Sequence, residues 1–453
     1  MALTVLAGGM RFAGITQPSD LVFDEHYAAD ACLFVLGPAG GCPVPQEIGL
    51  VHPPLGKWLI GAGIELFGFT PVGWRVAPLA AGTLSVALLY LLARRLLGST
   101  LAASLAAGLL AFDFLHFVMS RTAMLDVFVV LFGLASFLCL VYDCDRDPSG
   151  ETDGTSLPRL HQRPWLLAAG LAGGAAVASK WSGGYLLAAV ALLALAHGVT
   201  HRRHGQSGIR HLASRESVPL LVAFVLVPAA VYVGSYAGTL RGSLFAWPWA
   251  EGSWTHVFFE RHRLMFDHHM GSLYTHPYMS SAWSWPLIKR PVLFYFRELE
   301  GGVYQEILAI GNPVIWWAAL AALAVTTWQA VRGGAFQARE WVIVAGFAAG
   351  YVPWLLITRQ EAFLYYFLPS VPFLYLAVGH LVSSVPAGFR RLTASGALVV
   401  ASVGMFLFFW PLLTGRPVSH QRWEQRMLFS NCDPAERTPV IRPVPPPAGW
   451  CWQ

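Results

Sequence analysis

The chain has 453 residues, of which 55% are hydrophobic and 12% are charged, and its net charge is +5. A soluble globular protein carries about a quarter charged residues, so this composition excludes a soluble globule and predicts an integral membrane protein. The positive charges lie in alternate short loops between apolar runs. That distribution is a topology signal and gives no indication of a nucleic-acid partner.

Apolar runs long enough to cross about 30 Å of hydrocarbon recur along nearly the whole chain, which predicts spanning helices rather than a barrel. We predict about eleven spans, at 2–16, 77–97, 101–119, 123–142, 165–179, 184–200, 218–237, 312–331, 341–357, 363–382 and 393–413. The first is short and has neither a basic n-region nor a small-residue cleavage site, so we expect no cleavable signal peptide. Either this helix is truncated at its inner end or Met1 is not the natural start.

Arginine residues are concentrated in the loops on one side of these spans. They are Arg94, Arg95, Arg146, Arg159, Arg163, Arg202, Arg203, Arg210, Arg215, Arg332, Arg339, Arg390 and Arg391. The positive-inside rule assigns these loops to the cytoplasm, so 17–76, 238–311 and the tail from 414 are predicted to lie outside the cell membrane. We expect the loop over 238–311 to hold surface helices at most, and the tail beyond 434 to be extended or disordered.

The six cysteines agree with this topology. Cys32 and Cys42 share the first outer loop, and Cys432 and Cys451 share the outer tail, whereas Cys139 and Cys144 lie at the inner end of the fourth span. Because disulfides persist outside the cell and are disfavoured inside, we predict pairing within each outer segment. Unpaired thiols remain an equal alternative for Cys32 and Cys42.

Two adjacent carboxylates, Asp24 and Glu25, follow the first span after about ten residues. An acid pair at a membrane surface costs free energy unless it binds or catalyses something, although the two residues could also be solvated loop charges. Further polar side chains fall at the same outer boundary: His52, Lys57, Arg121, Asp126, Lys180 and Arg359. This combination suits a lipid-linked anionic donor, because a phosphate leaving group needs fixed positive charge and a neutral nucleophile needs a carboxylate to accept its proton.

Several of these residues also have a structural interpretation. Arg121 and Arg359 could extend to lipid headgroups, and Lys57 could be a surface anchor. Asp126 could cap a helix or pair with Arg121 inside the bundle. The sequence alone leaves both alternatives open.

Asp113 and His116 lie within the third span, where polar groups are either functional or form helix-to-helix hydrogen bonds. The second outer loop also contains four histidines, His262, His268, His269 and His276. Their spacing matches no standard set of metal ligands, so we predict no metal site there.

Five stretches, in their order and spacing, resemble one family over nearly the full length of the chain. They are Phe23 to Tyr27, His52 to Lys57, Phe117 to Asp126, His276 to Pro291, and Arg359 to Pro369, with Gly311 to Trp317 as a further match. The family is that of the polyprenyl-phosphate-mannose-dependent protein O-mannosyltransferases in their actinobacterial form. The resemblance implies an all-helical GT-C glycosyltransferase, with a transmembrane catalytic domain over 1–413, an active site built by the outer loops 17–76 and 238–311, and an outer tail over 414–453.

The resemblance also implies a reaction and its residues. Mannose would move from polyprenyl-phosphate mannose to Ser or Thr hydroxyls of unfolded or translocating exported polypeptides, with inversion, on the extracytoplasmic side of the plasma membrane. Asp24 would be the base and Glu25 would support it or the substrate. Arg121 and Lys180 would contact the phosphate, and Arg359 would act similarly or fix the outer loop. The other predicted substrate-binding residues are His52, Lys57, Asp126 and His276. No cofactor is predicted beyond the lipid-linked donor, divalent-ion dependence is left open, and membrane lipid and the secretion translocon are candidate partners.

Three other functions are compatible with parts of the sequence. The large lumenal insertion of the eukaryotic relatives is absent, so acceptor selection by such a module is not implied. A GT-C enzyme that uses a cell-wall glycan or lipid acceptor would have the same donor-side residues. A secondary transporter of an anionic amphiphile is disfavoured, because transporters place their sites near the midplane and usually show two related halves. A structural scaffold without activity is the remaining alternative.

Overall fold

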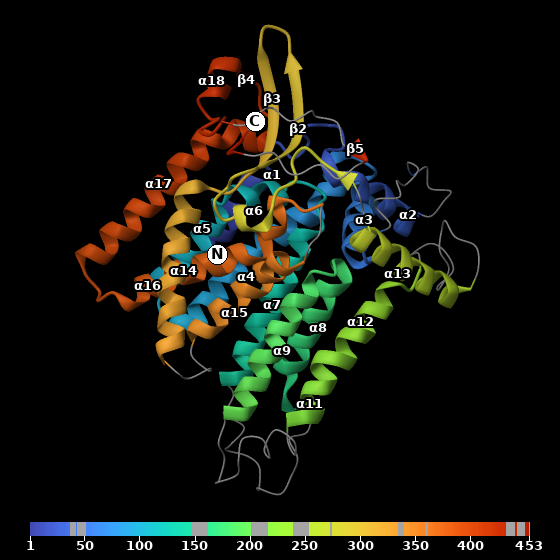
Figure 1. Ribbon diagram of the computed structural model, residues 1–453, viewed down its shortest axis with the longest axis vertical. Helices are drawn as coiled ribbons and strands as arrows, with labels where there is room; N and C mark the ends of the chain where they lie inside the picture. The colour runs from blue at the N-terminus through green and yellow to red at the C-terminus, as the bar shows by residue number, and fades with distance from the viewer. Residues whose placement is uncertain are drawn as a thin grey trace, which may run out of the picture.

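A computed structural model describes residues 1–36, 42, 51–145, 162–200, 216–238, 253–271, 274–333, 339–357, 361–431, 440–441 and 449–452. Within this part of the chain the long helices pack as one bundle, with short helices and strands gathered at one end of it (Figure 1). We call that end, which carries the hairpin of β2 (Val292–Leu299) and β3 (Val303–Ala309), the site end.

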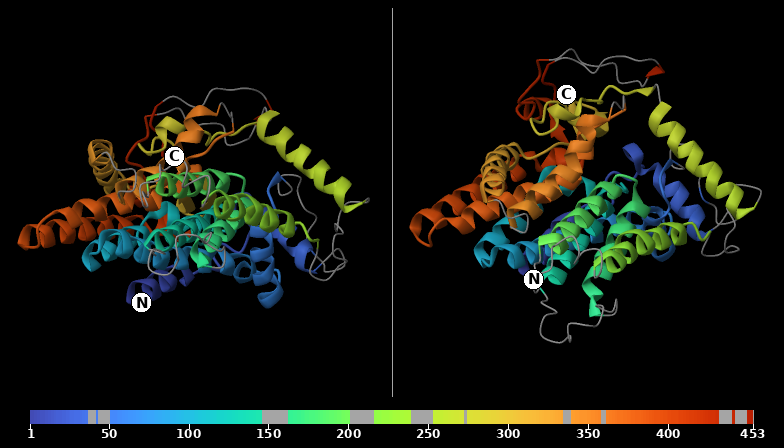
Figure 2. Two further views of the ribbon diagram at one scale, coloured as in Figure 1. Left: turned by 90° about the horizontal axis from the view of Figure 1, so that it is seen from below. Right: turned by 60° about the horizontal axis from the view of Figure 1, so that its bottom comes forward.

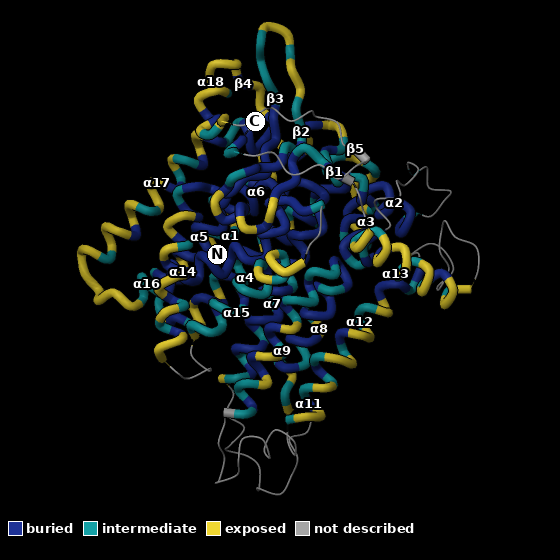
Figure 3. The backbone as a smooth tube through the Cα atoms, in the orientation of Figure 1, coloured by how far each residue is buried: buried dark blue, intermediate teal, exposed yellow. Residues whose placement is uncertain are grey.

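The first half of the bundle alternates long and broken helices. It consists of α1 (Ala2–Phe12), α4 (Pro71–Leu97), α5 (Thr100–Ala111), α6 (Phe114–Met119), α7 (Asp126–Asp145), α8 (Pro164–Ser179) and α9 (Gly183–Thr200). Helices α5, α6 and α7 are buried in the centre, whereas the later helix α17 (Phe389–Thr414) and the flanking α12 (Val227–Ser235) are far more exposed (Figure 3). An apolar helix with so exposed an outer face suits contact with lipid.

The second half continues the bundle. It consists of α11 (Ser217–Leu221), the π-helix η7 (Val222–Leu226), α12 (Val227–Ser235), α14 (Pro313–Gly333), α15 (Arg339–Leu356), the 3-10 helix η9 (Leu364–Ser370), α16 (Val371–Ser384) and α17 (Phe389–Thr414). Every predicted span falls on one or more helices of the two halves. Among the described residues, six helices are long and apolar enough to cross a membrane by length and composition, and four more are apolar but shorter. The count of eleven spans remains a prediction.

The third predicted span is broken, and Asp113 is the reason. Its Oδ1 accepts a hydrogen bond of 2.7 Å from the backbone N–H of His116 and so caps α6. Its Oδ2 accepts hydrogen bonds from Trp316 Nε1 of α14 (2.7 Å) and from the Tyr375 hydroxyl of α16 (2.6 Å). Nδ1 of His116 accepts a hydrogen bond of 2.9 Å from Arg11 of α1. The helix-to-helix interpretation of Asp113 and His116 is therefore confirmed.

The site end contains several short helices. They are the 3-10 helix η1 (Phe23–His26), α2 (Tyr27–Leu36), α3 (Leu55–Phe67), α13 (Trp254–Gly271) and the 3-10 helix η8 (Ala282–Ser284). The predicted disulfide between Cys32 of α2 and Cys42 is present. Cys451 is also disulfide-bonded, whereas its predicted partner Cys432 lies outside the described residues. Helices α13 and α17 lie on opposite flanks of the bundle (Figure 2).

The site end also contains β-structure, so the expectation of surface helices at most was wrong. Strand β2 (Val292–Leu299) pairs antiparallel with β3 (Val303–Ala309), which pairs with β4 (Val418–Ser419). A second pair joins β1 (Tyr274–Thr275) to β5 (Val440–Ile441). The reason is local: two runs rich in β-branched and aromatic residues flank Gly301 and Gly302, whose φ angles of 76° and 68° form the turn.

Part of the C-terminal tail packs on the site end. The tail begins with the short helix α18 (His420–Glu424). Near its end, the side chain of Trp452 is 1% exposed, and its Nε1 donates a hydrogen bond of 2.7 Å to the carbonyl of Ile288. The backbone N–H of Cys451 donates to the carbonyl of Lys289 at 3.0 Å. These residues are held against the loop over 238–311 rather than extended away from it.

The opposite end of the bundle carries ion pairs between the predicted inner loops. Arg95, at the end of α4, pairs with Asp145 at the end of α7. Arg163, just before α8, pairs with Asp143 and with Glu216 just before α11. These described ion pairs lie at helix ends remote from the β2–β3 hairpin (Figure 1).

Candidate active site

Asp24 lies in η1 at the site end and is half-buried. The preceding residue, Phe23, has a φ of 46°, in the left-handed region that a bulky residue rarely adopts and that stores strain. Its ring stacks on Phe294 of β2 at 4.6 Å and meets the rings of Phe363 and Tyr365 edge-on. Packing on several sides holds the strained residue in place, and it thereby fixes where Asp24 points.

Lys180 and Asp126 form an ion pair beside this loop. Lys180 ends α8, and its Nζ lies 3.0 Å and 2.8 Å from the two carboxylate oxygens of Asp126, the first residue of α7. The same Nζ lies 4.6 Å from the ring centre of Tyr366 and 5.7 Å from that of Tyr365. The Tyr365 hydroxyl donates a hydrogen bond of 3.3 Å to Asp24 Oδ2, so Tyr365 connects Asp24 to Lys180.

These surroundings set the protonation of Asp24. Burial raises the pKa of its carboxyl group to about 6. This value already includes the effects of Lys180 and of the hydrogen bond from Tyr365, which lower the pKa, and of the charges of Glu361 and Asp126, which raise it. A carboxylate with a pKa close to neutrality can accept a proton and release it again, which is what a general base requires.

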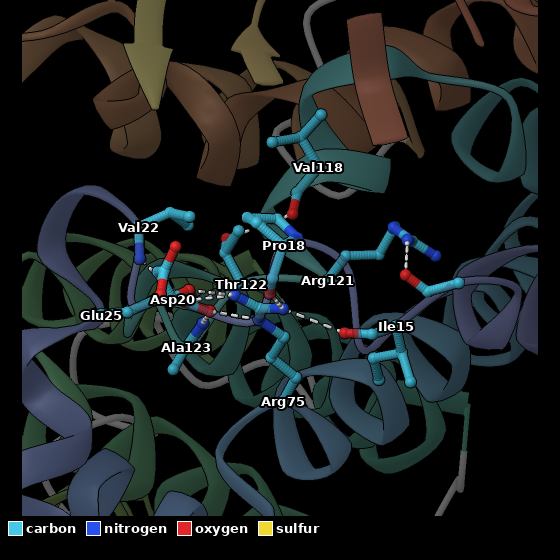
Figure 4. A network of polar contacts seen from close by, with 11 residues as sticks. Ile15, Pro18, Asp20, Val22, Glu25, Arg75, Val118, Arg121, Thr122 and Ala123 are labelled. Atoms are coloured by element: carbon cyan, nitrogen blue, oxygen red, sulfur yellow. Dashed lines mark hydrogen bonds and ion pairs between the residues drawn. The ribbon is translucent and has the colours of Figure 1, made fainter. Parts of the chain in front are cut away.

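Glu25 is fully buried and lies in a network of polar contacts with Arg75 and backbone groups (Figure 4). Arg75 of α4 donates to both of its carboxylate oxygens, each at 2.7 Å, and the backbone N–H groups of Ala123 and Val22 each donate at 3.0 Å. Arg75 also donates to three backbone carbonyls of the loop before η1, those of Ile15, Pro18 and Asp20. Glu25 and Arg75 thus fasten the loop that carries Asp24 to the bundle.

Arg121 is engaged by the backbone of α1. Its guanidinium donates to the carbonyls of Ala13 (2.7 Å) and Gly14 (2.9 Å) and also to that of Arg11, next to the ring of Phe117. Carbonyl groups at the end of a helix lack hydrogen-bond donors within the helix, and the Arg121 guanidinium provides these donors. Arg359 lies outside the described residues.

Lys57 is a buried residue and not a surface anchor. It lies on α3, and its Nζ is 3.0 Å from Oδ2 of Asp30 on α2; the two side chains are 2% and 0% exposed. The ring of His52 lies 5.6 Å from that of Tyr27 and 5.3 Å from that of His269 on α13. These contacts join α2, α3 and α13.

His276 lies against the aromatic residues that hold Phe23. Its ring is 5.8 Å from that of Phe23 and 5.4 Å from that of Phe363, and its Nδ1 accepts a hydrogen bond of 3.2 Å from the backbone N–H of Tyr278. Burial, together with the smaller effect of the charge of Arg290, lowers the pKa of His276 to about 4. The ring is therefore neutral at physiological pH, with a proton on Nε2.

The other loop histidines bind protein groups. Nε2 of His262 lies 2.8 Å from the Tyr232 hydroxyl, and Nε2 of His269 lies 3.1 Å from the carbonyl of Val51. Among the described residues no three His, Cys, Asp or Glu side chains come close enough to hold a metal ion.

The sequence reasoning missed several residues of this site. Arg75 and Asp30 were not singled out, although a charged residue inside an apolar helix is itself a signal of function or of a buried pair. Tyr365 was noted only as part of a motif. Their partners lie far away in the chain, so no local pattern reveals them.

Solved structures share this fold. The yeast Pmt1–Pmt2 protein O-mannosyltransferase complex, bound to the sugar donor, matches with a TM-score of 0.74 and 17% identity over 94% of this chain and 91% of that chain. ArnT from Cupriavidus metallidurans, bound to undecaprenyl phosphate, matches with a TM-score of 0.56 and 18% identity over 90% and 64%. The protein therefore has the GT-C fold of membrane glycosyltransferases.

Sequence comparison narrows the class to one family. Residues 70–237 match the family described as dolichyl-phosphate-mannose-protein mannosyltransferase, and residues 254–432 match the C-terminal four-TMM region of protein-O-mannosyltransferase. The chain is 31% identical to polyprenol-phosphate-mannose–protein mannosyltransferases of Mycolicibacterium smegmatis (93% of this chain, 90% of the relative) and Mycobacterium tuberculosis (93% and 89%). The chain belongs to the protein O-mannosyltransferase family.

Proposed function

We propose that the protein transfers mannose from polyprenyl-phosphate mannose to Ser or Thr hydroxyls of exported polypeptides, with Asp24 as the general base. The relatives that cover most of the chain are named for this donor and for protein acceptors. The observation that carries the proposal is Asp24 itself, a half-buried carboxylate with a pKa of about 6, fixed by a strained neighbour beside Tyr365 and Lys180.

The reaction follows from these groups. A Ser or Thr hydroxyl is too weak an acid to ionise beforehand, so Asp24 takes its proton as the oxygen attacks the anomeric carbon, a contribution of about 10²- to 10⁴-fold. The bond from that carbon to the phosphate oxygen breaks, and polyprenyl phosphate leaves with the electron pair. Attack opposite the leaving group inverts the anomeric centre. Positive charge near the phosphate stabilises the developing negative charge.

Lys180 would assist in two ways. Its ion pair with Asp126 keeps a positive charge beside Tyr365, which lowers the pKa of Asp24 and keeps the base ionised. The same charge favours binding of an anionic donor. Glu25 and Arg75 make no direct contribution to the chemistry and would act by holding η1 in place.

We also propose that the site faces the extracytoplasmic side of the plasma membrane. Support comes from the ion-paired Arg95 and Arg163 at the opposite end, which belong to the loops that the positive-inside rule assigns to the cytoplasm. The Cys32–Cys42 disulfide at the site end also suits an oxidising compartment. An acceptor that passes through the membrane unfolded would meet the site on that side, next to the secretion translocon.

The proposal is tested with purified protein in lipid nanodiscs, labelled polyprenyl-phosphate mannose and a Thr-rich peptide from an exported protein. We expect label on the peptide with the anomeric configuration inverted. Transfer to a glycan or lipid acceptor in parallel reactions, with none to the peptide, would contradict the assignment of the acceptor. Absence of transfer to any acceptor would contradict the assigned reaction.

A further inference from the structure

Tyr27 is a buried residue at the start of α2, close to Asp24. Helix η1 continues directly into α2, so Tyr27 lies three residues beyond Asp24 on one helical stretch, and residues at this spacing share a face. Tyr27 is 4% exposed and packs in an apolar cluster with Ile60 of α3 and with Leu125. The ring of His52 meets its ring edge-on at 5.6 Å. Neighbours from several elements therefore fix the position of the Tyr27 ring.

The hydroxyl group of Tyr27 has no partner in the protein. Among the described residues no group forms a hydrogen bond with it, and yet protein atoms do not close over its oxygen. The hydroxyl of Tyr365, by comparison, donates to Asp24, and that of Tyr375 donates to Asp113. A buried polar group that stays without a partner costs free energy. The Tyr27 hydroxyl therefore faces a place that a ligand atom can reach, and a ligand would supply the missing hydrogen bond.

The charges that act on this hydroxyl belong to the candidate active site. Burial raises the pKa of Tyr27 well above its ordinary value, the charge of Asp24 is the next largest cause, and Tyr366 and Asp126 are among the further ones. The last two residues also surround Lys180, whose Nζ lies 4.6 Å from the ring centre of Tyr366 and 2.8 Å from Asp126. The hydroxyl thus keeps its proton and lies among the groups that surround Asp24.

The geometry of an inverting transfer decides which part of the substrate can meet this hydroxyl. The base lies within hydrogen-bond reach of the attacking hydroxyl, which approaches the anomeric carbon opposite the phosphate. The phosphate is therefore on the far side of that carbon from Asp24, whose charge would also repel it. A hydrogen bond from Tyr27 to the attacking oxygen would weaken the nucleophile, because it would occupy a lone pair. The hydroxyls of the sugar remain, and they can donate and accept as a tyrosine hydroxyl does.

We propose that the Tyr27 hydroxyl binds a hydroxyl group of the mannosyl residue of the donor and thereby orients the sugar beside Asp24. A site built to hydrogen-bond a substrate hydroxyl discriminates against an analogue that lacks it, so Tyr27 would contribute to the choice of sugar. This inference rests on the proposed function, because it concerns the same donor. Tyr27→Phe removes a single oxygen atom and leaves the described contacts of the ring in place.

The test combines this substitution with changes in the sugar. Wild type and Tyr27→Phe in nanodiscs receive a Thr-rich peptide and either polyprenyl-phosphate mannose or a series of donors that each lack one hydroxyl of the mannose, and kcat/KM is measured for each. Tyr375→Phe is the matched control, because its buried hydroxyl donates a hydrogen bond of 2.6 Å to Asp113 within the bundle. Thermal melting without ligand and the pH–rate profile are recorded for all three proteins.

With the complete donor, we expect Tyr27→Phe to lower kcat/KM by about 3- to 10-fold, the usual effect of losing one neutral hydrogen bond. For one of the deoxy donors the substitution should cause no further loss, because the bond that it removes is already absent. For the other donors the variant should stay slower than the wild type by the same factor. Tyr375→Phe should show no such dependence on the donor.

Two further measurements separate this role from a structural one. The melting temperature of Tyr27→Phe should equal that of the wild type, because the hydroxyl has no protein partner, whereas Tyr375→Phe should melt at a lower temperature. The acid limb of the Tyr27→Phe profile should keep its wild-type position, because the hydroxyl forms no hydrogen bond with Asp24 in the described structure.

Two results would overturn the inference: wild-type rates of Tyr27→Phe with every donor, or a loss that is the same for every donor. In the second case, a lower melting temperature would assign the loss to folding, and a displaced acid limb would assign it to the base. If the wild type itself transfers no mannose, the proposed function fails. If the wild type transfers mannose and the loss in Tyr27→Phe does not depend on the donor, only the role of Tyr27 fails.

Discussion

Arg75→Met is expected to be among the most damaging single substitutions that leave Asp24 itself intact. Glu25 is 0% exposed, and two of its four hydrogen-bond donors belong to Arg75. Without Arg75 a buried carboxylate keeps only the backbone donors of Ala123 and Val22. Breaking one side of a buried ion pair typically costs about 3–5 kcal/mol, because the remaining charge is uncompensated. The carbonyls of the preceding loop lose their donor as well.

The assay is unfolding of the protein in mixed micelles, combined with mannose transfer to a peptide. Arg95→Met is the matched control, because the pair of Arg95 with Asp145 is exposed, at 46% and 42%, and should be worth only about 0–1 kcal/mol. The double variant Arg75→Met/Glu25→Gln should be less damaged than the sum of the two single variants. Wild-type stability and turnover in Arg75→Met, or strict additivity in the double variant, would refute the idea that this pair holds η1.

Two further predictions concern the acid limb of the pH–rate profile. Lys180→Met removes a charge that lowers the pKa of Asp24, so the acid limb should move to higher pH, whereas Lys180→Arg should keep it near the wild-type position; an unmoved limb in Lys180→Met would show that Lys180 does not act on Asp24. Tyr365→Phe removes the hydrogen bond to Asp24 and should lower kcat by about 3- to 10-fold, with the same upward displacement of the limb. Steady-state rates that equal those of the wild type from pH 5 to 8 would contradict that role.

The helices of the bundle could be predicted from the sequence because long apolar runs carry a strong local signal. Each predicted span lies on helix. The disulfide between Cys32 and Cys42 was one of two equal alternatives that their shared loop left open, and the structure shows the pair. The break at Asp113 could not be placed, because it depends on donors from Trp316 and Tyr375, more than two hundred residues further along the chain. The β2–β3 hairpin was missed for a different reason, since its local signal was present but was outweighed by the expectation of short surface helices.

The sequence could predict which charged residues lie at the site, but it could not predict which of them form ion pairs. Asp24, Asp126 and Lys180 lie together, as expected for one boundary of the membrane. The partners of Lys57 and Glu25 were unknown, because an ion pair between two helices leaves no trace in the spacing of either.

The central claim, that Asp24 is the base, is tested most directly by single-turnover transfer at saturating donor. For the wild type, the rate should fall as the pH drops below about 6, because the base must be ionised and its pKa is raised to about 6. Asp24→Asn should lower the rate by about 10²- to 10⁴-fold while donor affinity stays within about two-fold of the wild type. Wild-type turnover by Asp24→Asn, or a loss fully explained by weaker donor binding, would contradict the account.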